Sequence, residues 1–421
     1  MPRRKIAFGD FNRPLDAAVV AWLDKDIGRL LAVYRDLHAH PELSTREKRT
    51  SAIVASLLAR AGARVTRNVG GHGVVGVLRN GPGPTVFIRA DMDALPVVEE
   101  TGLPYRSKTK GVMHACGHDV HSTALAGIAS ILAGAKETWR GTVILVAQPA
   151  EELASGAEAM VEDGLFARFP RPDVCLALHV DDEIPVGRLA YTPAWATANV
   201  DSVDITILGR GGHGAKPHTT EDPIVAAAHV ITALQTIVTR RIDPIQPVVI
   251  TVGSIHAGQK HNIIPDQAVM QLTVRTFTPA VRRKVLRNIK AVATDAARAA
   301  GCSRAPEVNT DVESTAASYN DPALCDHAAR IFAKVAGKEN VKTEPPTMGG
   351  EDFSVYPDAL GVPGLLYSVG AVSLAAVKAA KKGGKPLPPL HSPRFAPVPE
   401  PTLRLSVRSM CALAGSLLGR P

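Results

Sequence analysis

Aromatic residues, cysteines and long apolar runs are scarce in this 421-residue chain, and each scarcity argues against a class of protein. Only 4% of the residues are aromatic, too few to build a surface that stacks nucleic-acid bases. The five cysteines are odd in number and far apart, which indicates a reducing compartment rather than a disulfide framework. The basic N-terminus lacks an apolar segment, and no apolar run reaches about 18 residues. The sequence therefore predicts a cytoplasmic protein without a signal peptide, a membrane span or a nucleic-acid partner.

The bulk composition suits a folded chain of two domains. Hydrophobic residues make up 45% of the sequence, enough for a sizeable core, and the length exceeds that of a typical single domain. The formal net charge is +8, from 48 Lys and Arg against 40 Asp and Glu. We interpret this modest excess as an aid to solubility with a mild attraction for anionic substrates.

Two successive patterns of elements organise the chain. Predicted helices at 14–40, 44–61 and 119–134 are interspersed with apolar strands, which favours an α/β fold whose parallel-type sheet is covered on both faces. These strands are expected at 73–78, 85–90, 142–147 and 174–180. From about residue 196 the order becomes β-α-β-β-α-β, that of a ferredoxin-like α+β unit inserted into the first domain. Its elements are expected at 200–208, 222–241, 248–256, 268–276, 279–300 and 306–310.

Metal-binding side chains follow several of the predicted strands. Cys116 and His118, two residues apart before a helix, suit zinc best, although a buried cysteine beside capping residues would look alike. Glu151 and Glu152 follow a buried strand, where adjacent carboxylates call for a cation; a solvated first helical turn is the alternative. His179 ends another strand, and ligands bind at the carboxyl ends of strands in α/β sheets. The sequence has no Walker A, HExxH or GxSxG motif.

Eight motifs occur in order from residue 35 to residue 395: RDLHAHPELS (35–44), RADMDALP (89–96), MHACGHDVH (113–121), QPAEE (148–152), GRGGHGAKPH (209–218), HNIIPD (261–266), MGGEDFS (348–354) and LHSPRF (390–395). Together they make the chain resemble the M20 metallopeptidase family. The chain is most like the amidohydrolase branch, with its hippurate hydrolases, N-acyl-amino-acid deacylases and auxin-conjugate hydrolases. The resemblance implies a mixed-sheet catalytic domain at 1–195 and 311–421. It implies an inserted ferredoxin-like lid and dimerisation domain at 196–310.

The resemblance also implies a cofactor and a reaction. Two divalent metal ions, Mn, Zn, Co or Ni, would be held by Cys116, His118, Glu152, His179 and His391. Glu151 would be the general base that splits the amide bond of an N-acyl amino acid. The acyl group would be acetyl, benzoyl or aryl-acetyl. A dipeptidase or aminopeptidase of the same family is the first alternative, and an inactive metal-bearing binding protein is the second. The expected partners are a small amide substrate and a second copy of the chain, paired through the lid.

Residues outside the ligand set have expected roles as well. By resemblance, His213 would face the reacting carbonyl, and Asn262 and Arg275 would hold the substrate carboxylate. We interpret Asp93 as the group that orients a histidine ligand. The histidines at 38 and 40 are expected to be structural, favoured by the dipole at a helix end, and the acidic residues at 351 and 352 to brace the site. The stretch 371–390, which contains AAKKGGKPLPP, is predicted to be a flexible basic loop at the site entrance.

Overall fold

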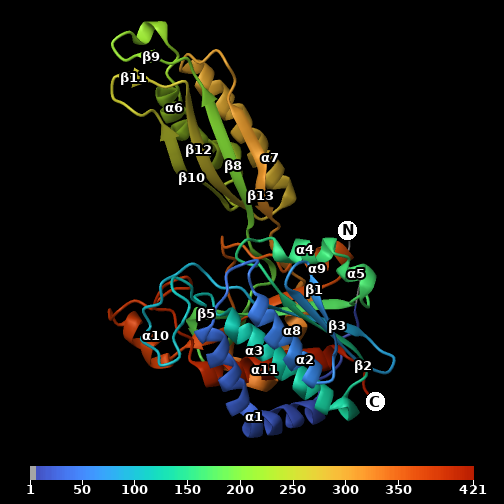
Figure 1. Cartoon of the computed structure of the whole chain (residues 1–421). Coiled ribbons are helices and arrows are strands. Elements are labelled where there is room, and N and C mark those ends of the chain that lie inside the picture. The colour runs from blue at the N-terminus through green and yellow to red at the C-terminus, as the bar shows by residue number, and fades with distance from the viewer. Residues whose placement is uncertain (1–5) are drawn as a thin grey trace. The chain divides into compact units, whose positions relative to one another are not determined.

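The chain forms two compact units in a computed structural model that describes residues 6–421 (Figure 1). The first unit comprises the chain up to Ala196 together with Tyr319–Pro345 and Asp352–Pro421. The second comprises Thr197–Ser318 and Pro346–Glu351. The short strands β7 (Ala194–Thr197) and β14 (Ser318–Asn320) lie where the chain passes from one unit to the other. The prediction that the chain has no signal peptide rests partly on residues 1–5, which lie outside the described residues.

An eight-stranded mixed sheet runs through the first unit in the order β1-β2-β4-β3-β5-β16-β6-β15. The strands are β1 (Arg64–Val69), β2 (Gly73–Asn80), β3 (Thr85–Asp91), β4 (Gly141–Gln148), β5 (Val174–Pro185), β6 (Leu189–Tyr191), β15 (Val341–Thr343) and β16 (Gly364–Val372). The four central strands are β4, β3, β5 and β16. Each pair of neighbours within this group, β4–β3, β3–β5 and β5–β16, is parallel. The pairs β1–β2, β2–β4 and β6–β16 are antiparallel. The parallel pairing predicted from the apolar strands is therefore found at the centre, and one further parallel pair, β15–β6, lies at an edge of the sheet.

Helices cover both faces of this sheet, as predicted (Figure 1). Successive residues of a strand point to opposite faces, so Ile88 joins one apolar cluster and Phe87 joins the other. The first cluster is completed by α1 (Arg13–Ala39), α2 (Lys48–Arg60), α3 (His118–Gly134), α8 (Pro322–Ala336) and α11 (Pro399–Leu417). The second is completed by α4 (Gly156–Glu162), α5 (Leu165–Arg168) and α9 (Val355–Leu360). Because both faces are buried, the central strands are apolar at nearly every position.

The second unit has the predicted β-α-β-β-α-β order. Its elements are β8 (Asn199–Leu208), α6 (Pro223–Thr236), β10 (Val248–Ala257), β12 (Gln267–Thr276), α7 (Pro279–Ala299) and β13 (Glu307–Thr315). The strands form an antiparallel sheet in the order β10-β12-β8-β13. Buried and part-exposed residues alternate along β8, as expected for a sheet with helices on one face. The strand predicted at 306–310 is longer in the structure, because β13 pairs with β8 as far as Thr315.

One helix among residues 6–421 is long and apolar enough to cross a membrane, by length and composition alone. It comprises α6 and the short π-helix η3 (Ile237–Arg241). Ala226, Val230 and Leu234 on this helix are fully buried in the apolar cluster of the second unit. A core helix of a soluble protein gives the same signal, so this helix is weak evidence for a membrane span.

The prediction of a flexible loop over 371–390 is wrong for its first half. β16 extends to Val372, and α10 (Leu374–Lys381) follows directly. The Ser373 side chain caps this helix by accepting a hydrogen bond from the N–H of Ala376 at 3.1 Å. Alanine-rich sequence favours the helix, and Val377 is buried. The lysines and glycines that suggested a loop lie at the end of α10 and beyond it.

Candidate metal centre

The candidate site lies where parallel strands of the first unit end. Asp91 at the end of β3 is opposite Gln148 at the end of β4, and Arg89 is opposite Ala177 of β5. Since the carboxyl ends of parallel strands meet at one edge, this register brings together the segments that follow β3 and β4 and the middle of β5. Those segments carry Asp93, the Glu151–Glu152 turn and His179.

The start of α3 and the loop before it bring His118 and Cys116 to the same edge. Gly117 separates them with a φ of +87°, a conformation that favours glycine. A Cβ atom there would lie 2.3 Å from a methyl carbon of Val180 on β5, so only glycine lets the loop pack against the strand. As a result, the Cys116 Sγ lies 3.5 Å from the Nε2 of His179.

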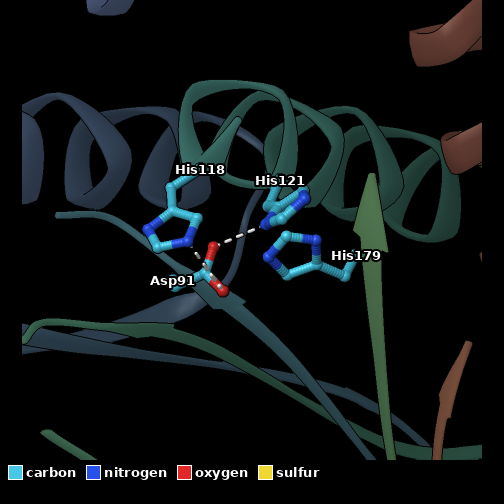
Figure 2. A group of neighbouring side chains, drawn as sticks. All are labelled: Asp91, His118, His121 and His179. Carbon is cyan, nitrogen blue, oxygen red and sulfur yellow. Dashed lines mark hydrogen bonds and ion pairs between the residues drawn. The ribbon is translucent and has the colours of Figure 1, made fainter. Parts of the chain in front are cut away.

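Three histidines and an aspartate gather around this point, but they are not equivalent (Figure 2). The Nδ1 of His121 lies 2.6 Å from Asp91 Oδ1, and its Nε2 accepts the N–H of Val180 at 2.9 Å. Both ring nitrogens are therefore used, one as donor and one as acceptor, which is the neutral form. Burial lowers the pKa of His121 to about 4, in agreement with this state. His121 connects Asp91 to β5 and has no nitrogen left for a metal ion.

His118, in contrast, directs a ring nitrogen into the site with nothing to bond it. Its Nδ1 lies 3.1 Å from Asp93 Oδ1, so the ring is oriented by the residue predicted to do so. Its Nε2 lies 3.8 Å from Glu151 Oε2 and 3.9 Å from Glu152 Oε1. Among residues 6–421, neither His118 Nε2 nor Glu152 Oε1 has a hydrogen-bond partner, and both atoms are buried. Leaving such an atom unbonded costs on the order of 1–3 kcal/mol, so this pair is suited to share a cation.

The sequence-distant His391 reaches the same point from the C-terminal part of the unit. Its Nε2 lies 3.5 Å from Glu152 Oε1, and ligand atoms of Cys116, Glu152 and His391 all lie within 4.8 Å of one another. The N–H of His391 donates to the carbonyl of Ala115 at 2.9 Å, which places it beside Cys116. Its φ of +68° is unusual for histidine, and such strain is concentrated at functional sites.

The structure thus brings all five predicted ligands and Glu151 to one place. The donors are a thiol, imidazole nitrogens and carboxylate oxygens, a set that suits zinc and similar divalent ions. Burial raises the pKa of the Cys116 thiol well above its ordinary value. Burial opposes a charge on His118, yet the anionic Asp91 raises the pKa of that ring well above its ordinary value. A site so rich in negative groups favours a cation, and a bound metal ion would take the place of these protons.

A buried polar network beneath the site was not predicted. Arg89 is 1% exposed and donates to Asp91 at 2.6 Å, to Gln148 at 2.8 Å and to Asp352 at 2.9 Å. Gln148 donates in turn to both carboxylate oxygens of Asp352 at 2.7 Å. The signal was present in the sequence: an arginine inside the otherwise apolar strand TVFIRAD requires buried partners. The expected bracing role thus falls on Asp352, while Glu351 belongs to the second unit.

His38 was expected to interact only with the end of its own helix, but the structure gives it further partners. The residue does lie in the last turn of α1, but its Nδ1 is 2.7 Å from Asp119 and its Nε2 is 3.3 Å from Glu99. Burial disfavours a charge on this ring, but the hydrogen bonds to Asp119 and Glu99 raise its pKa to about 9. His38 is therefore protonated at neutral pH and ties α1 to the start of α3. His40 stays local, with its Nδ1 2.8 Å from the carbonyl of Asp36.

The three substrate-binding candidates of the second unit do not lie together. His213 in β9 (Gly212–His213) pairs with Ile263 of β11 (Ile263–Ile264), and the N–H of Gly214 donates to the carbonyl of Asn262. His213 and Asn262 are thus neighbours, and both are exposed. Arg275 lies towards the other end of β12, opposite Val249 and Val200, and its Nε donates to Thr273.

Known proteins resemble this chain over most of its length. The model of peptidase family M20/M25/M40 matches residues 87–381. Thermostable carboxypeptidase 1 of Saccharolobus solfataricus is 37% identical over 91% of this chain and 94% of its own. N-acetyl-L-cysteine deacetylase of Bacillus subtilis is 39% identical, covering 78% of this chain and 77% of its own. Hippurate hydrolase of Campylobacter jejuni is 38% identical, covering 78% and 85%.

A solved structure agrees with these relatives. It is that of a Bacillus subtilis protein described as a dinuclear metal binding peptidase from the M20 family. Its TM-score against this chain is 0.75 at 31% identity, and the match covers 93% of this chain and 98% of the other. The family model alone spans well over half of the sequence. The chain therefore belongs to peptidase family M20/M25/M40.

Proposed function

We propose that this protein is a metal-dependent amidohydrolase that splits an N-acyl amino acid into a carboxylic acid and a free amino acid. The observation that carries the proposal is the pair of buried, unbonded ligand atoms, His118 Nε2 and Glu152 Oε1, next to the carboxylate of Glu151. The names of two relatives, N-acetyl-L-cysteine deacetylase and hippurate hydrolase, describe this class of substrate. A small-molecule amide is therefore the expected partner.

The proposed metal ligands are the five that the sequence predicts. Two divalent ions, Mn, Zn, Co or Ni, would be held by Cys116, His118, Glu152, His179 and His391. When bound, they supply the positive charge that acidifies a water molecule and polarises the amide carbonyl. Asp93 holds the Nδ1 side of the His118 ring, so the Nε2 faces the site. The carbonyl of Val180 does the same for His179, because it lies 2.7 Å from the Nδ1 of that ring.

Glu151 is proposed to move the proton. Its carboxylate is largely buried beside His118 but is not needed to complete the ligand set. It would take a proton from the attacking water and deliver it to the nitrogen of the leaving amino acid. His213, which belongs to the second unit, would stabilise the negative charge that develops on the carbonyl oxygen. Asn262 and Arg275 would bind the substrate carboxylate, a task for which the planar guanidinium is suited.

A peptidase is the alternative that a specific observation favours, because one relative is named a carboxypeptidase. Both reactions hydrolyse an amide bond, so the proposed roles of Glu151 and the ligands are the same. The two differ in the group on the other side of the bond: an acyl group in one case and a peptide in the other. A metal-bearing protein without activity is disfavoured, since Glu151 would then have no function.

A panel of substrates tests the proposal directly. We expect the protein with added Mn²⁺ to release free amino acid from at least one N-acetyl, N-benzoyl or indole-acetyl amino acid. Chelation by EDTA should abolish the release, and readdition of Mn²⁺ should restore it. Release from dipeptides alone would select the peptidase, and no release from any compound by metal-loaded protein would contradict the proposal.

We further propose that the second unit acts as a lid and pairs two chains into a homodimer. Residues 263–274 separate Asn262 from Arg275, and the part of this stretch that belongs to β12, 267–274, alone spans roughly 25 Å of extended chain. One copy therefore cannot apply both residues to one small substrate, and a second copy would supply the missing ones. Mixing inactive His213→Ala and Arg275→Ala chains should restore part of the activity, because hybrid dimers contain one complete site. A monomeric mass in solution, or no restoration, would contradict this arrangement.

The proposed location is the cytoplasm, as the cysteine usage suggests. All five cysteines are buried and none forms a disulfide. Cell fractionation should recover the protein with the soluble cytoplasmic fraction, and recovery with membranes would contradict this location.

A further inference from the structure

The turn that carries Glu151 and Glu152 has an unusual backbone. It follows β4, and two of its residues adopt left-handed conformations, Ala150 with a φ of +51° and Ala154 with a φ of +52°. Alanine rarely takes this conformation because its Cβ crowds the following carbonyl oxygen. The turn is therefore not set by local preference, and other parts of the molecule must hold it in place.

A segment far away in the sequence supplies that support. Glu47 is 0% exposed, and its Oε1 accepts the N–H of Ala150 at 2.8 Å and that of Thr45 at 2.9 Å. Three residues earlier, Ser44 donates to Asp93 Oδ2 at 2.7 Å. The same Asp93 oxygen accepts the N–H of Glu152 at 2.9 Å. Backbone N–H groups on both sides of Glu151 are thus held through segment 44–47.

We propose that Glu47 is a positioning residue that holds the Ala150 turn and thereby places Glu151 and Glu152 in the site. The role rests on the proposed function in so far as Glu151 moves the proton and Glu152 binds metal. Glu47 is fully buried and bonds the backbone of the turn, so it acts through the turn and not on the substrate.

A simple helix-capping role does not explain Glu47. It occupies the N-cap position of α2, yet its side chain caps no N–H of that helix. Glu42 does so instead, with oxygens that accept the N–H groups of Arg49 at 2.9 Å and Thr50 at 2.8 Å. The carboxyl group of Glu47 turns away from its own helix to bond Ala150. Glu42 is therefore a matched control, because it supports the same helix without a bond to the turn.

The state of the Glu47 carboxyl group points to a conservative replacement. Its Oε2 is buried and has no hydrogen-bond partner among residues 6–421. Burial raises the pKa of Glu47 to about 7, so the group is partly neutral under ordinary conditions. Glutamine keeps the oxygen that accepts from Ala150 and is always neutral. Glu47→Gln should preserve the support, whereas Glu47→Ala removes it.

Kinetics of three variants of the full chain test the role. Glu47→Ala should lower kcat about 10–100-fold, the usual effect of losing a residue that orients a metal site, with KM little changed. Glu47→Gln should restore most of kcat. Glu42→Ala should lower thermal stability but keep kcat near that of the unaltered protein. A folded Glu47→Ala protein with unaltered kcat, or an equal loss of kcat in Glu42→Ala, would overturn the proposal.

Two further measurements do not depend on turnover. Amide hydrogen exchange in a peptide covering residues 149–155 should be faster in metal-free Glu47→Ala than in Glu42→Ala. Calorimetric titration should show weaker Mn²⁺ binding to Glu47→Ala, because Glu152 follows the released turn. Unchanged exchange and unchanged Mn²⁺ affinity would overturn the positioning role. These readouts remain valid if the unaltered protein hydrolyses none of the proposed substrates, so the two proposals can fail separately.

A second-site change covers the case in which Glu47→Ala folds poorly. Glycine adopts a φ of +51° without strain, so Ala150→Gly should let the turn form with less support. Adding Ala150→Gly to Glu47→Ala should recover part of the lost kcat and slow the exchange at residues 149–155. A folded double variant that recovers neither would contradict the proposal.

Discussion

Glu151→Gln is expected to lose roughly 10²–10⁴-fold in kcat, the range that general acid–base catalysis contributes, while it binds metal normally. Glutamine matches glutamate in size and fills the same largely buried space at the end of β4. It cannot accept a proton from water, so only the proton transfer is removed. The measurement is kcat on the best substrate of the panel, together with metal content from elemental analysis of the purified protein.

Two neighbouring glutamates make this result specific. Glu152→Gln should instead lower the metal content, since Glu152 offers the unbonded Oε1 that faces both His118 and His391. Glu158→Gln, at an exposed position in the first turn of α4, should change neither quantity. If Glu151→Gln keeps substantial activity with a full metal content, Glu151 is not the proton carrier.

The sequence predicts the parts of this site that depend on local pattern. Apolar runs mark the central strands; Glu152 follows one such run and His179 ends another, whereas Cys116 lies directly before the helix α3. Parallel strands have their carboxyl ends at one edge, so a shared site could be expected before its geometry was known. The position of Asp93 could also be predicted, because this residue comes two positions after the end of β3. In the structure its carboxylate lies beside the His118 ring.

The support of the site was hidden because it depends on contacts between distant residues. Arg89 bonds Asp352, 263 positions later, and Glu47 bonds Ala150, 103 positions later. Nothing in the local sequence shows that Ala150 adopts a left-handed conformation, since alanine normally avoids it. The error over 371–390 has another cause: a lysine- and glycine-rich end obscured a capped, alanine-rich helix.

Arg89→Met is expected to destabilise the first unit by about 3–5 kcal/mol, the usual effect of removing one partner from a buried ion pair. Methionine fills much of the same volume, so the loss is electrostatic rather than a cavity. Asp91 and Asp352, both 1% exposed or less, would keep their charges without the guanidinium. A native protein has only about 5–15 kcal/mol of stability in total, so low yield and a large fall in Tm should follow.

Arg89→Lys should recover only part of this loss. The ammonium group is a single point charge, whereas the guanidinium of Arg89 meets Asp91, Gln148 and Asp352 with three different nitrogens. The matched control is Arg404→Met, which removes a part-exposed arginine paired with Asp24 and Glu400 at the surface. That change should cost about 0–1 kcal/mol, as surface ion pairs do.

The destabilisation caused by Arg89→Met should be confined to the first unit. Arg89 and its three partners all belong to the first unit, so hydrogen exchange should increase there and stay unchanged over residues 200–315. Because Asp91 also bonds His121, which bonds Val180 of β5, release of Asp91 should loosen the strand that carries His179. Metal affinity should then fall along with stability. A stable Arg89→Met protein with unaltered Mn²⁺ binding would show that the site does not depend on this arginine.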